Sequence, residues 1–329
     1  MTARAGLAPY PSPEERDARL GALAAAGGGE CLTIGTTHRG RPIRVARIPS
    51  TGAPRRGAGP PDRVLVCAGI HGLEYIGCVS ALALLERLAA ADGPLARLRE
   101  RAEVWVIASL NPDGYARAWE IEGEGPLDDL RTNARGVDLN RNYPLPAPQR
   151  PVTFNLGGWR TGSAVPGNAF YRGAHPLSEP ETAALAALHA EQRFAASANL
   201  HSTWGTLIPP LTPASAHQRA YRHLCRVFAA SQSVARYKRL AWSSLDRFIG
   251  EQEDYQHHVL DAWALCIEHY PVWRELARHQ DERVFWRFNP RAPERWIAND
   301  VPGIVAFLNA ALDLGRPSRH APNVLPPRL

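Results

Sequence analysis

His71 and Glu74 are side chains of the types that bind metal ions, and they stand three positions apart. They follow a short apolar run, residues 64–67, which predicts a buried strand that ends at Gly69. Apolar residues at helical spacing follow from Tyr75 onward. Because positions i and i+3 of a helical turn share one side, an imidazole and a carboxylate there could reach one ion. Two such residues also occur together by chance, so a metal site needs a third ligand elsewhere in the chain.

Further chemically active side chains follow later apolar segments. His201 comes directly after the segment 194–200, and Glu268 comes directly after the segment 262–267. A polar run from Arg131 to Pro144 lies in a long stretch with little periodicity and much Gly, Pro and Asn, which is typical of functional loops. The carboxyl ends of strands in such sheets line a cleft. A lone histidine or glutamate at a strand end is also typical of structural residues, so the residues alone leave both interpretations open.

Taken in order, four signals resemble those of the zinc carboxypeptidases of the carboxypeptidase A-like family. They are His71-Gly-Leu-Glu74, Arg131-Thr-Asn-Ala-Arg-Gly-Val-Asp-Leu-Asn-Arg-Asn-Tyr-Pro144, Leu200-His201-Ser202 and Cys266-Ile267-Glu268. The resemblance covers residues 30–315, and its most specific part is the run from Gly136 to Asn142. Together with Ser178-Glu-Pro-Glu181, the pattern looks most like the small single-domain bacterial members such as the murein-peptide amidases, which lack the pro-domain of the pancreatic enzymes.

The resemblance implies one Zn²⁺ per chain, held by His71, Glu74 and His201 with a fourth position open for water. In the family, the counterpart of Asp138 accepts a hydrogen bond from the first histidine ligand, which fixes the tautomer of that ring. Glu268 would be the general base that takes a proton from zinc-activated water and passes it to the departing amine.

Three more residues would contact the substrate. By resemblance, Arg131 would stabilise the oxyanion together with zinc. Asn140 and Arg141 would hold a free carboxylate of the substrate through charge-assisted hydrogen bonds. Plain surface arginines are the alternative for both arginine positions, and Arg135 is close enough in sequence to take the place of Arg131.

The chain also departs from the pancreatic pattern. At the distance where those enzymes carry a mobile tyrosine, this chain has Asp246, so that Tyr255 or Tyr237 would have to substitute. Glu253 falls near the position that reads the substrate side chain, where an acid would favour a basic side chain.

The elements that must position these residues alternate between strands and helices. The patterns predict helices at 13–26, 75–88, 178–192, 214–233, 251–260 and 301–312. They predict strands at 31–34, 42–48, 64–67, 103–110, 194–200, 206–208 and 262–267. Ser178 is predicted as an N-cap with Glu181 closing a capping box, and Asn111 as the start of a turn. His257 and His258 are interpreted as helix-surface residues and not as further ligands.

This β-α-β order favours an α/β protein with one domain. With the resemblance it predicts a three-layer α/β/α sandwich around a mixed twisted sheet. We expect a lead-in with one helix at 1–29, the catalytic domain at 30–315 and a Pro-rich tail at 316–329.

Composition limits the remaining classes of function and partner. The chain has 329 residues, 45% of them hydrophobic, which is enough for a full core. Its net charge of +6 is compatible with binding to nucleic acid. Its arginines, however, are spread along the chain and are not interleaved with aromatic residues, so we expect no nucleic-acid partner. The five cysteines are widely spaced and are interpreted as reduced core residues. We see no signal peptide and no membrane span, and therefore expect a cytoplasmic protein without a membrane partner.

These expectations combine into a zinc-dependent metallohydrolase, a carboxypeptidase or peptide amidase, whose substrate is a peptide or acyl-amino acid with a free carboxylate. One alternative is an N-acyl amino acid acylase of the aspartoacylase or succinylglutamate desuccinylase kind, which is related in fold and zinc ligands. The other is a catalytically silent member that binds carboxylated peptides. The side-chain preference, stereochemistry and oligomeric state do not follow from the sequence.

Overall fold

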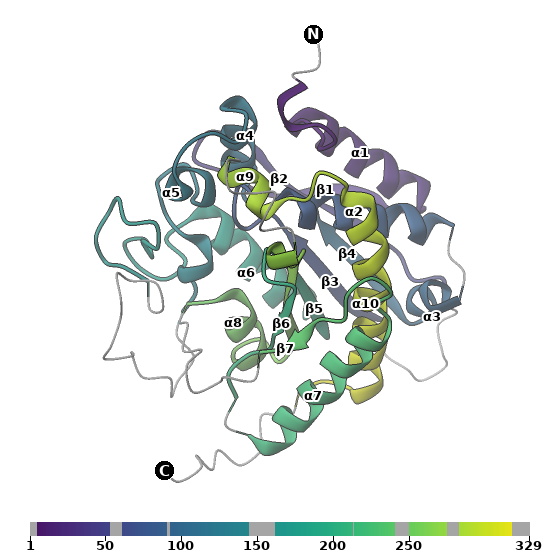
Figure 1. The fold of residues 1–329 in the computed structure, drawn as a ribbon. Helices are drawn as coiled ribbons and strands as arrows, with labels where there is room; N and C mark the ends of the chain where they lie inside the picture. Colours follow the sequence, from purple (N-terminus) through teal and green to yellow (C-terminus); the bar gives the residue numbers. More distant parts are fainter. Residues whose placement is uncertain are drawn as a thin grey trace.

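An eight-stranded mixed sheet forms the centre of the computed structural model, which describes residues 5–52, 61–90, 93–144, 162–212, 214–240, 250–274 and 283–317 (Figure 1). The order of the strands across the sheet is β1-β2-β4-β3-β5-β8-β6-β7. Their bounds are β1 Glu30–Thr36, β2 Pro42–Ile48, β3 Asp62–Ala68, β4 Ala102–Ile107, β5 Ala196–Ser202, β6 Thr206–Ile208, β7 Lys238–Arg239 and β8 Trp263–His269.

The central strands of the sheet run parallel. β3 pairs in parallel with β4 on one side and β5 on the other, and β5 pairs in parallel with β8. β1 and β2 form an antiparallel hairpin at one edge, and β6 lies antiparallel to β8. The carboxyl ends of β3, β5 and β8 therefore meet at one edge of the sheet, which is where the predicted metal ligands were expected.

Helices cover both faces of the sheet (Figure 1). The α-helices are α1 Pro13–Ala26, α2 Tyr75–Ala89, α3 Gly93–Arg101, α4 Pro112–Glu120, α5 Leu127–Arg131, α6 Pro180–Gln192, α7 Ser215–Ala230, α8 Gln252–His258, α9 Val284–Phe288 and α10 Pro293–Leu314. Three short 3₁₀ helices are Ala5–Leu7, Leu139–Arg141 and Val272–Arg274.

Alternate residues of β3 separate two hydrophobic cores. Val64 and Val66 belong to the core shared with α1, α2, α7 and α10, whereas Leu65 and Cys67 belong to the core shared with α6 and α8. Successive side chains of a strand point to opposite faces, so both faces of the sheet are buried. The predicted three-layer α/β/α architecture is confirmed. Leu20 of α1 belongs to the first core. The predicted boundary between residues 29 and 30 stays a prediction.

Several predicted element ends are wrong. Asn111 does not start a turn: it is the N-cap of α4, with its side chain accepting from the backbone N of Gly114. Ser178 is not the N-cap of α6, because that position belongs to Glu179, and Ser178 Oγ donates instead to the Glu179 carboxylate. The last helix begins at Pro293, eight residues before the predicted start at Val301. Polar side chains in its first turns hide its apolar period from the sequence pattern.

The segment Val284–Leu314 is the one part of the described chain long and apolar enough to cross a membrane. In the structure 67% of its most apolar window is buried within the fold, and α10 contributes Phe307 and Leu308 to the first core. It is a core helix by its contacts. All five cysteines are free and four of them are buried, as predicted.

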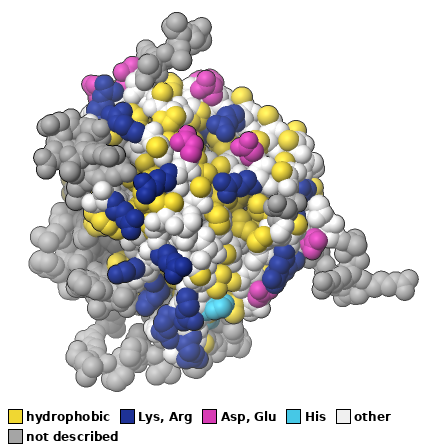
Figure 2. All heavy atoms as spheres, turned by 45° about the vertical axis from the view of Figure 1, so that its right-hand side comes forward, with side chains coloured by type: hydrophobic (Ala, Val, Ile, Leu, Met, Phe, Trp, Pro, Cys, Tyr) yellow, Lys and Arg dark blue, Asp and Glu magenta, His cyan; other side chains and the backbone are white. Residues whose placement is uncertain are grey.

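Figure 2 shows one face of the molecule, on which Lys and Arg side chains are spread among acidic and hydrophobic ones. Several basic side chains lie together near its lower edge. The expectation that nucleic acid is no partner stays a prediction.

Candidate active site

The turn between β3 and α2 presents His71 and Glu74, and it depends on two glycines. Gly69 has a φ of +64°, a conformation that L side chains rarely adopt. At Gly72 the obstacle is contact: a Cβ there would lie 2.5 Å from a backbone carbon of Gly114. Glu74 is the N-cap of α2, so the two ligand-type residues lie in the turn itself and not in the helix.

His201, near the carboxyl end of β5, joins this pair. Nδ1 of His71 lies 2.9 Å from Oε1 of Glu74, and Nδ1 of His201 lies 3.2 Å from Oε2 of the same carboxylate. All three residues are buried, and their ligand atoms lie within 4.8 Å of one another. The structure thus brings together, around one point, three residues from segments that are far apart in sequence.

The donor set of this group fits a catalytic zinc ion. Two imidazoles and one carboxylate are the ligands of many such sites. Oε2 of Glu74 is buried, and its contact with Nδ1 of His201 is an ion-pair contact that lacks hydrogen-bond geometry. Burial would raise the pKa of Glu74, but the two histidines outweigh it and lower that pKa to about 2. Burial lowers the pKa of His201, which favours the neutral ring that binds metals.

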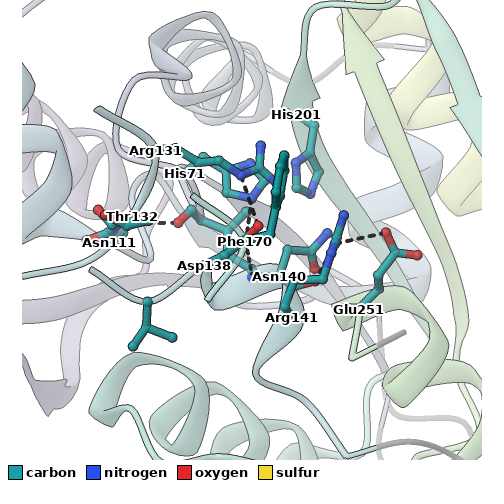
Figure 3. Close-up of polar contacts among 12 residues, drawn as sticks. His71, Asn111, Arg131, Thr132, Asp138, Asn140, Arg141, Phe170, His201 and Glu251 are labelled. Carbon is teal, nitrogen blue, oxygen red and sulfur yellow. Dashed lines mark hydrogen bonds and ion pairs between the residues drawn. The ribbon is translucent and has the colours of Figure 1, made fainter. Parts of the chain in front are cut away.

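Asp138 connects this group to the loop that follows α5. Its side chain is fully buried and accepts hydrogen bonds from His71 Nε2 at 3.2 Å, Arg131 Nε at 3.0 Å and the backbone N of Asn140 at 3.0 Å (Figure 3). Burial opposes the charge, but Arg131 and His71 hold the pKa of Asp138 far below its usual range. A carboxylate on Nε2 directs Nδ1 of His71 toward Glu74 and a metal.

Arg131 is partly buried and donates to Asp138, whereas Arg135 is exposed. In Figure 3 the Arg131 guanidinium is near His71 and His201, and Phe170 lies beside it. The guanidinium carbon is 5.6 Å from the centre of the Phe170 ring. The sequence analysis missed Phe170, because it lies in the long aperiodic stretch where no pattern marks a single aromatic residue.

Asn140 and Arg141 lie on the 3₁₀ helix that follows Asp138. Oδ1 of Asn140 accepts from the backbone N of Gln252, the first residue of α8. Nη1 of the buried Arg141 donates to the Asn140 carbonyl at 2.6 Å and to Oε1 of Glu251 at 3.3 Å (Figure 3). Glu251 was treated only as the start of a helix in the sequence analysis. Its partner is 110 residues away, so no local signal could have revealed this ion pair.

Glu268 lies opposite His201 on the neighbouring strand. The two are direct partners in the parallel pairing of β5 with β8. Glu268, His201 and Cys266 offer ligand-type atoms within 4.8 Å of one another. Burial and then the charge of Glu74 raise the pKa of Glu268 well above its usual value, and Arg131 opposes them. A carboxylate with a raised pKa, next to a metal-type group, is suited to proton transfer.

The predicted substitutes for the mobile tyrosine lie in different settings. Tyr237 is buried and its hydroxyl donates to Asp300. Tyr255 stacks on Tyr143 with ring centres 5.5 Å apart. Asp246 lies outside the described residues.

The interpretation of His257 as a surface residue is wrong. His257 is buried beneath α7, where its Nδ1 lies 3.0 Å from the hydroxyl of Tyr221 and its Nε2 lies 3.2 Å from Nδ1 of His217. The rings of His217, Tyr221 and Trp263 pack against His257, and this tertiary packing is not visible in the sequence pattern. His258 is partly buried and contacts the Leu211 carbonyl. Glu253 on the same helix is also buried.

The mixed sheet with helices on both faces makes this an α/β protein. The buried group of His71, Glu74 and His201 at its strand ends is of the kind that binds a metal ion. The model of the family described as zinc carboxypeptidase matches residues 28–271. That is most of the chain, and the chain belongs to this family. The resemblance proposed from the four sequence signals is therefore confirmed.

The curated relatives match only in part. Carboxypeptidase D of Rattus norvegicus is 28% identical over 247 residues, which is 62% of this chain and 16% of that protein. Carboxypeptidase D of Mus musculus is 35% identical over 135 residues, which is 34% of this chain and 10% of that protein. The inactive metallocarboxypeptidase ECM14 of Ajellomyces dermatitidis is 28% identical over 185 residues, which is 53% of this chain and 29% of that protein.

Solved structures show the same fold over nearly the whole chain. Bovine thrombin-activatable fibrinolysis inhibitor, in complex with tick carboxypeptidase inhibitor, has a TM-score of 0.72 at 17% identity and covers 93% of this chain and 98% of that chain. Carboxypeptidase A from Helicoverpa armigera has a TM-score of 0.69 at 20% identity and covers 92% of this chain and 74% of that chain.

Proposed function

We propose that this protein is a zinc-dependent metallohydrolase that cleaves an amide bond next to a carboxylate-bearing residue of a peptide or acyl-amino acid. The observation that carries the proposal is the position of Glu268. It pairs across the sheet with His201, beside a buried group of three zinc-type ligands. A site that only bound metal for structure would need no additional carboxylate with a raised pKa at its side.

The chain's own residues divide the chemistry between them. Zinc held by His71, Glu74 and His201 would supply a Lewis acid for the scissile carbonyl and for water. Glu268 takes the proton of the attacking water and delivers it to the leaving nitrogen. Arg131, fixed by its hydrogen bond to Asp138, presents a permanent positive charge to the oxyanion.

Arg141 is the proposed anchor for the substrate carboxylate. Support comes from the contact of its Nη1 with Oε1 of Glu251, in which this guanidinium already pairs with a carboxylate. Arg–carboxylate contacts are directional and charge-assisted, which makes the guanidinium selective for a free carboxylate. Binding of substrate then exchanges one carboxylate partner of Arg141 for another.

Two other functions remain as alternatives. An N-acyl amino acid acylase would use the same ligands and the same base on a smaller substrate. A catalytically silent protein that binds carboxylated peptides has support from one relative, which is named an inactive metallocarboxypeptidase. The presence of Glu268 beside the ligand group favours hydrolysis over silent binding.

The first experiment measures metal content. Elemental analysis of the untagged protein should give zinc, and His201→Ala should lose the zinc that the three ligands hold. His223→Ala, an exposed histidine on α7, is the matched control and should keep it. Unchanged zinc in His201→Ala would mean that the ligands lie elsewhere.

The second experiment measures turnover on a panel of peptides, murein fragments and N-acyl amino acids. Glu268→Gln should keep zinc and lose turnover, whereas the exposed control Glu86→Gln should keep both. Peptide turnover supports the peptidase, and turnover restricted to N-acyl amino acids supports the acylase. Zinc-loaded wild-type protein that binds these compounds but hydrolyses none of them would support the silent member.

A further inference from the structure

A second group of metal-type side chains lies at the start of α6. It consists of His38, on the turn between β1 and β2, together with Glu179 and Glu181. Each offers one nitrogen or oxygen, and these atoms lie within 4.8 Å of one another. None of the three belongs to the group around His201. The sequence analysis treated the two glutamates only as signals for a helix start.

Hydrogen bonds hold Glu179 in place within this group. His38 Nε2 lies 2.9 Å from Oε2 of Glu179, and Nδ2 of Asn133 donates to the same oxygen at 2.8 Å. Ser178 Oγ donates to Oε1 of Glu179 at 2.8 Å. Burial would raise the pKa of Glu179, but these hydrogen bonds together lower it, so this carboxylate carries its charge.

Glu181 is different, because one oxygen of its buried carboxylate has no hydrogen-bond donor among the described residues. Its residue is 0% exposed, and its Oε2 receives one long hydrogen bond of 3.3 Å from Asn133. Its Oε1 has no hydrogen-bond partner among the described residues. A buried carboxylate oxygen without a donor destabilises the fold, so it requires an explanation such as a bound ion.

We propose that His38, Glu179 and Glu181 form a second metal site, which binds a divalent transition metal ion such as Zn²⁺. One imidazole and two carboxylates suit zinc and its neighbours in the first transition row. Calcium requires six to eight oxygen ligands, and magnesium prefers oxygen ligands with several waters. The group offers one nitrogen and few oxygens, so both hard cations fit it poorly.

The three residues differ in their exposure to solvent, with His38 exposed and the two glutamates buried. The His38 side chain is 22% exposed, whereas Glu179 and Glu181 are buried beneath it. An ion would therefore enter past His38 and would be held by two carboxylates in a medium of low dielectric. A proton is the competitor for the same oxygen, since burial raises the pKa of Glu181 to about 7.

The second site would brace the loop that carries the proposed catalytic residues. Asn133, which donates to both carboxylates, accepts on its Oδ1 from the backbone N of Arg135 and of Val137. At the other end of the loop, Nδ2 of Asn142 donates to Ser178 Oγ, which in turn donates to Glu179. The ion would thus hold both ends of the segment 133–142, and its role there is positioning and not catalysis.

Zinc stoichiometry tests the proposal. Metal-free, untagged protein is titrated with Zn²⁺ alone and followed by calorimetry and by elemental analysis after gel filtration. We expect two equivalents for the wild type, one for His201→Ala, one for His38→Ala and none for the double variant. His175→Ala, an exposed histidine on the loop before α6, should bind two equivalents as the wild type does.

Two outcomes separate this proposal from the proposed function. If the wild type binds one equivalent and His38→Ala binds the same, the second site does not exist. If His201→Ala keeps all the zinc and His38→Ala loses it, the second site stands and the ligand group around His201 is wrong. Glu181→Gln, which preserves the side-chain volume, should lose the same equivalent as His38→Ala.

A stability readout checks that the ion is held within the fold. In the His201→Ala background, Zn²⁺ should raise the melting temperature, because it binds the native state only. Adding His38→Ala should abolish that rise. A rise that persists in the double variant would overturn the assignment of these ligands, and Ca²⁺ should produce no comparable rise.

Discussion

Asp138→Asn tests how the loop and the metal-type group depend on each other. The substitution keeps the volume of a fully buried side chain that accepts from His71, Arg131 and Asn140. The amide can still accept from His71, but its NH₂ group would face the donor Nε of Arg131. Removing one partner of a buried ion pair typically costs about 3–5 kcal/mol. We expect the low end, about 3 kcal/mol, because the Arg131 side chain is 13% exposed to solvent.

The same substitution should weaken zinc binding. Loss of a carboxylate behind a histidine ligand lowers metal affinity about 10–100-fold, which at saturating zinc is ~1.4–2.8 kcal/mol less stabilisation of the native state. Urea unfolding should therefore show a loss of about 3 kcal/mol without metal and roughly 4–6 kcal/mol with zinc, as the sum of the two effects.

The control for this prediction is Asp313→Asn. Asp313 pairs with Arg97 and Arg101 at the surface, so its loss should change the free energy of unfolding by less than about 1 kcal/mol with or without zinc. The reasoning is refuted if Asp138→Asn lowers the free energy of unfolding by the same amount with and without zinc. Asp138 would then make no contribution to zinc binding through His71. It is also refuted if the metal-free variant is as stable as the wild type.

Three further predictions concern the framework of the site. Gly72→Ala should unfold at a lower urea concentration and lose zinc, because the new Cβ would lie 2.5 Å from the backbone of Gly114. The control is Gly21→Ala in the middle of α1, where a Cβ meets nothing within 4 Å. This control should stabilise the protein by roughly 0.5–1 kcal/mol. Leu308→Ala on α10 should cost about 2–5 kcal/mol in the free energy of unfolding, since Leu308 is 0% exposed in the first core; a loss below ~1 kcal/mol would argue against a tightly packed α10. Burial lowers the pKa of His189 from 6.5 to about 3, so the unfolded state binds more protons between these values and stability falls with pH below 6.5. At pH 5 the loss in the free energy of unfolding is about 2 kcal/mol. His189→Leu should remove this part of the pH dependence in urea titrations at about pH 7 and about pH 5, which lie on either side of the ordinary histidine pKa.

The order of elements could be predicted because the chain marks most of them locally. The helix Pro13–Ala26 has its Ser12 cap, its proline at the first position and its Glu15 in the sequence, and the structure contains that capping box. The strand β2 has the predicted bounds Pro42–Ile48. In contrast, Ser178 carries a similar signal and is no cap, since its hydroxyl is used by Glu179 within a tertiary cluster.

The candidate site could be predicted in its residue types but not in its connections. His71, Glu74 and His201 stand at recognisable strand ends, and the structure brings them together. The pairs Arg141–Glu251 and Arg131–Phe170 depend on contacts between segments with no common pattern. The group of His38 with Glu179 and Glu181 joins a turn to a helix start 141 residues away, and only the fold reveals it.

The direct pairing of His201 with Glu268 has a consequence for how this protein can change. Their separation is set by backbone hydrogen bonds between two central strands, and a slip of one residue would turn either side chain to the other face of the sheet. The loops attach to the ends of these strands. Insertions, deletions or grafted loops can therefore alter what is recognised while the pair that would move the proton keeps its spacing, which makes this sheet a durable frame for new specificities in evolution and in engineering.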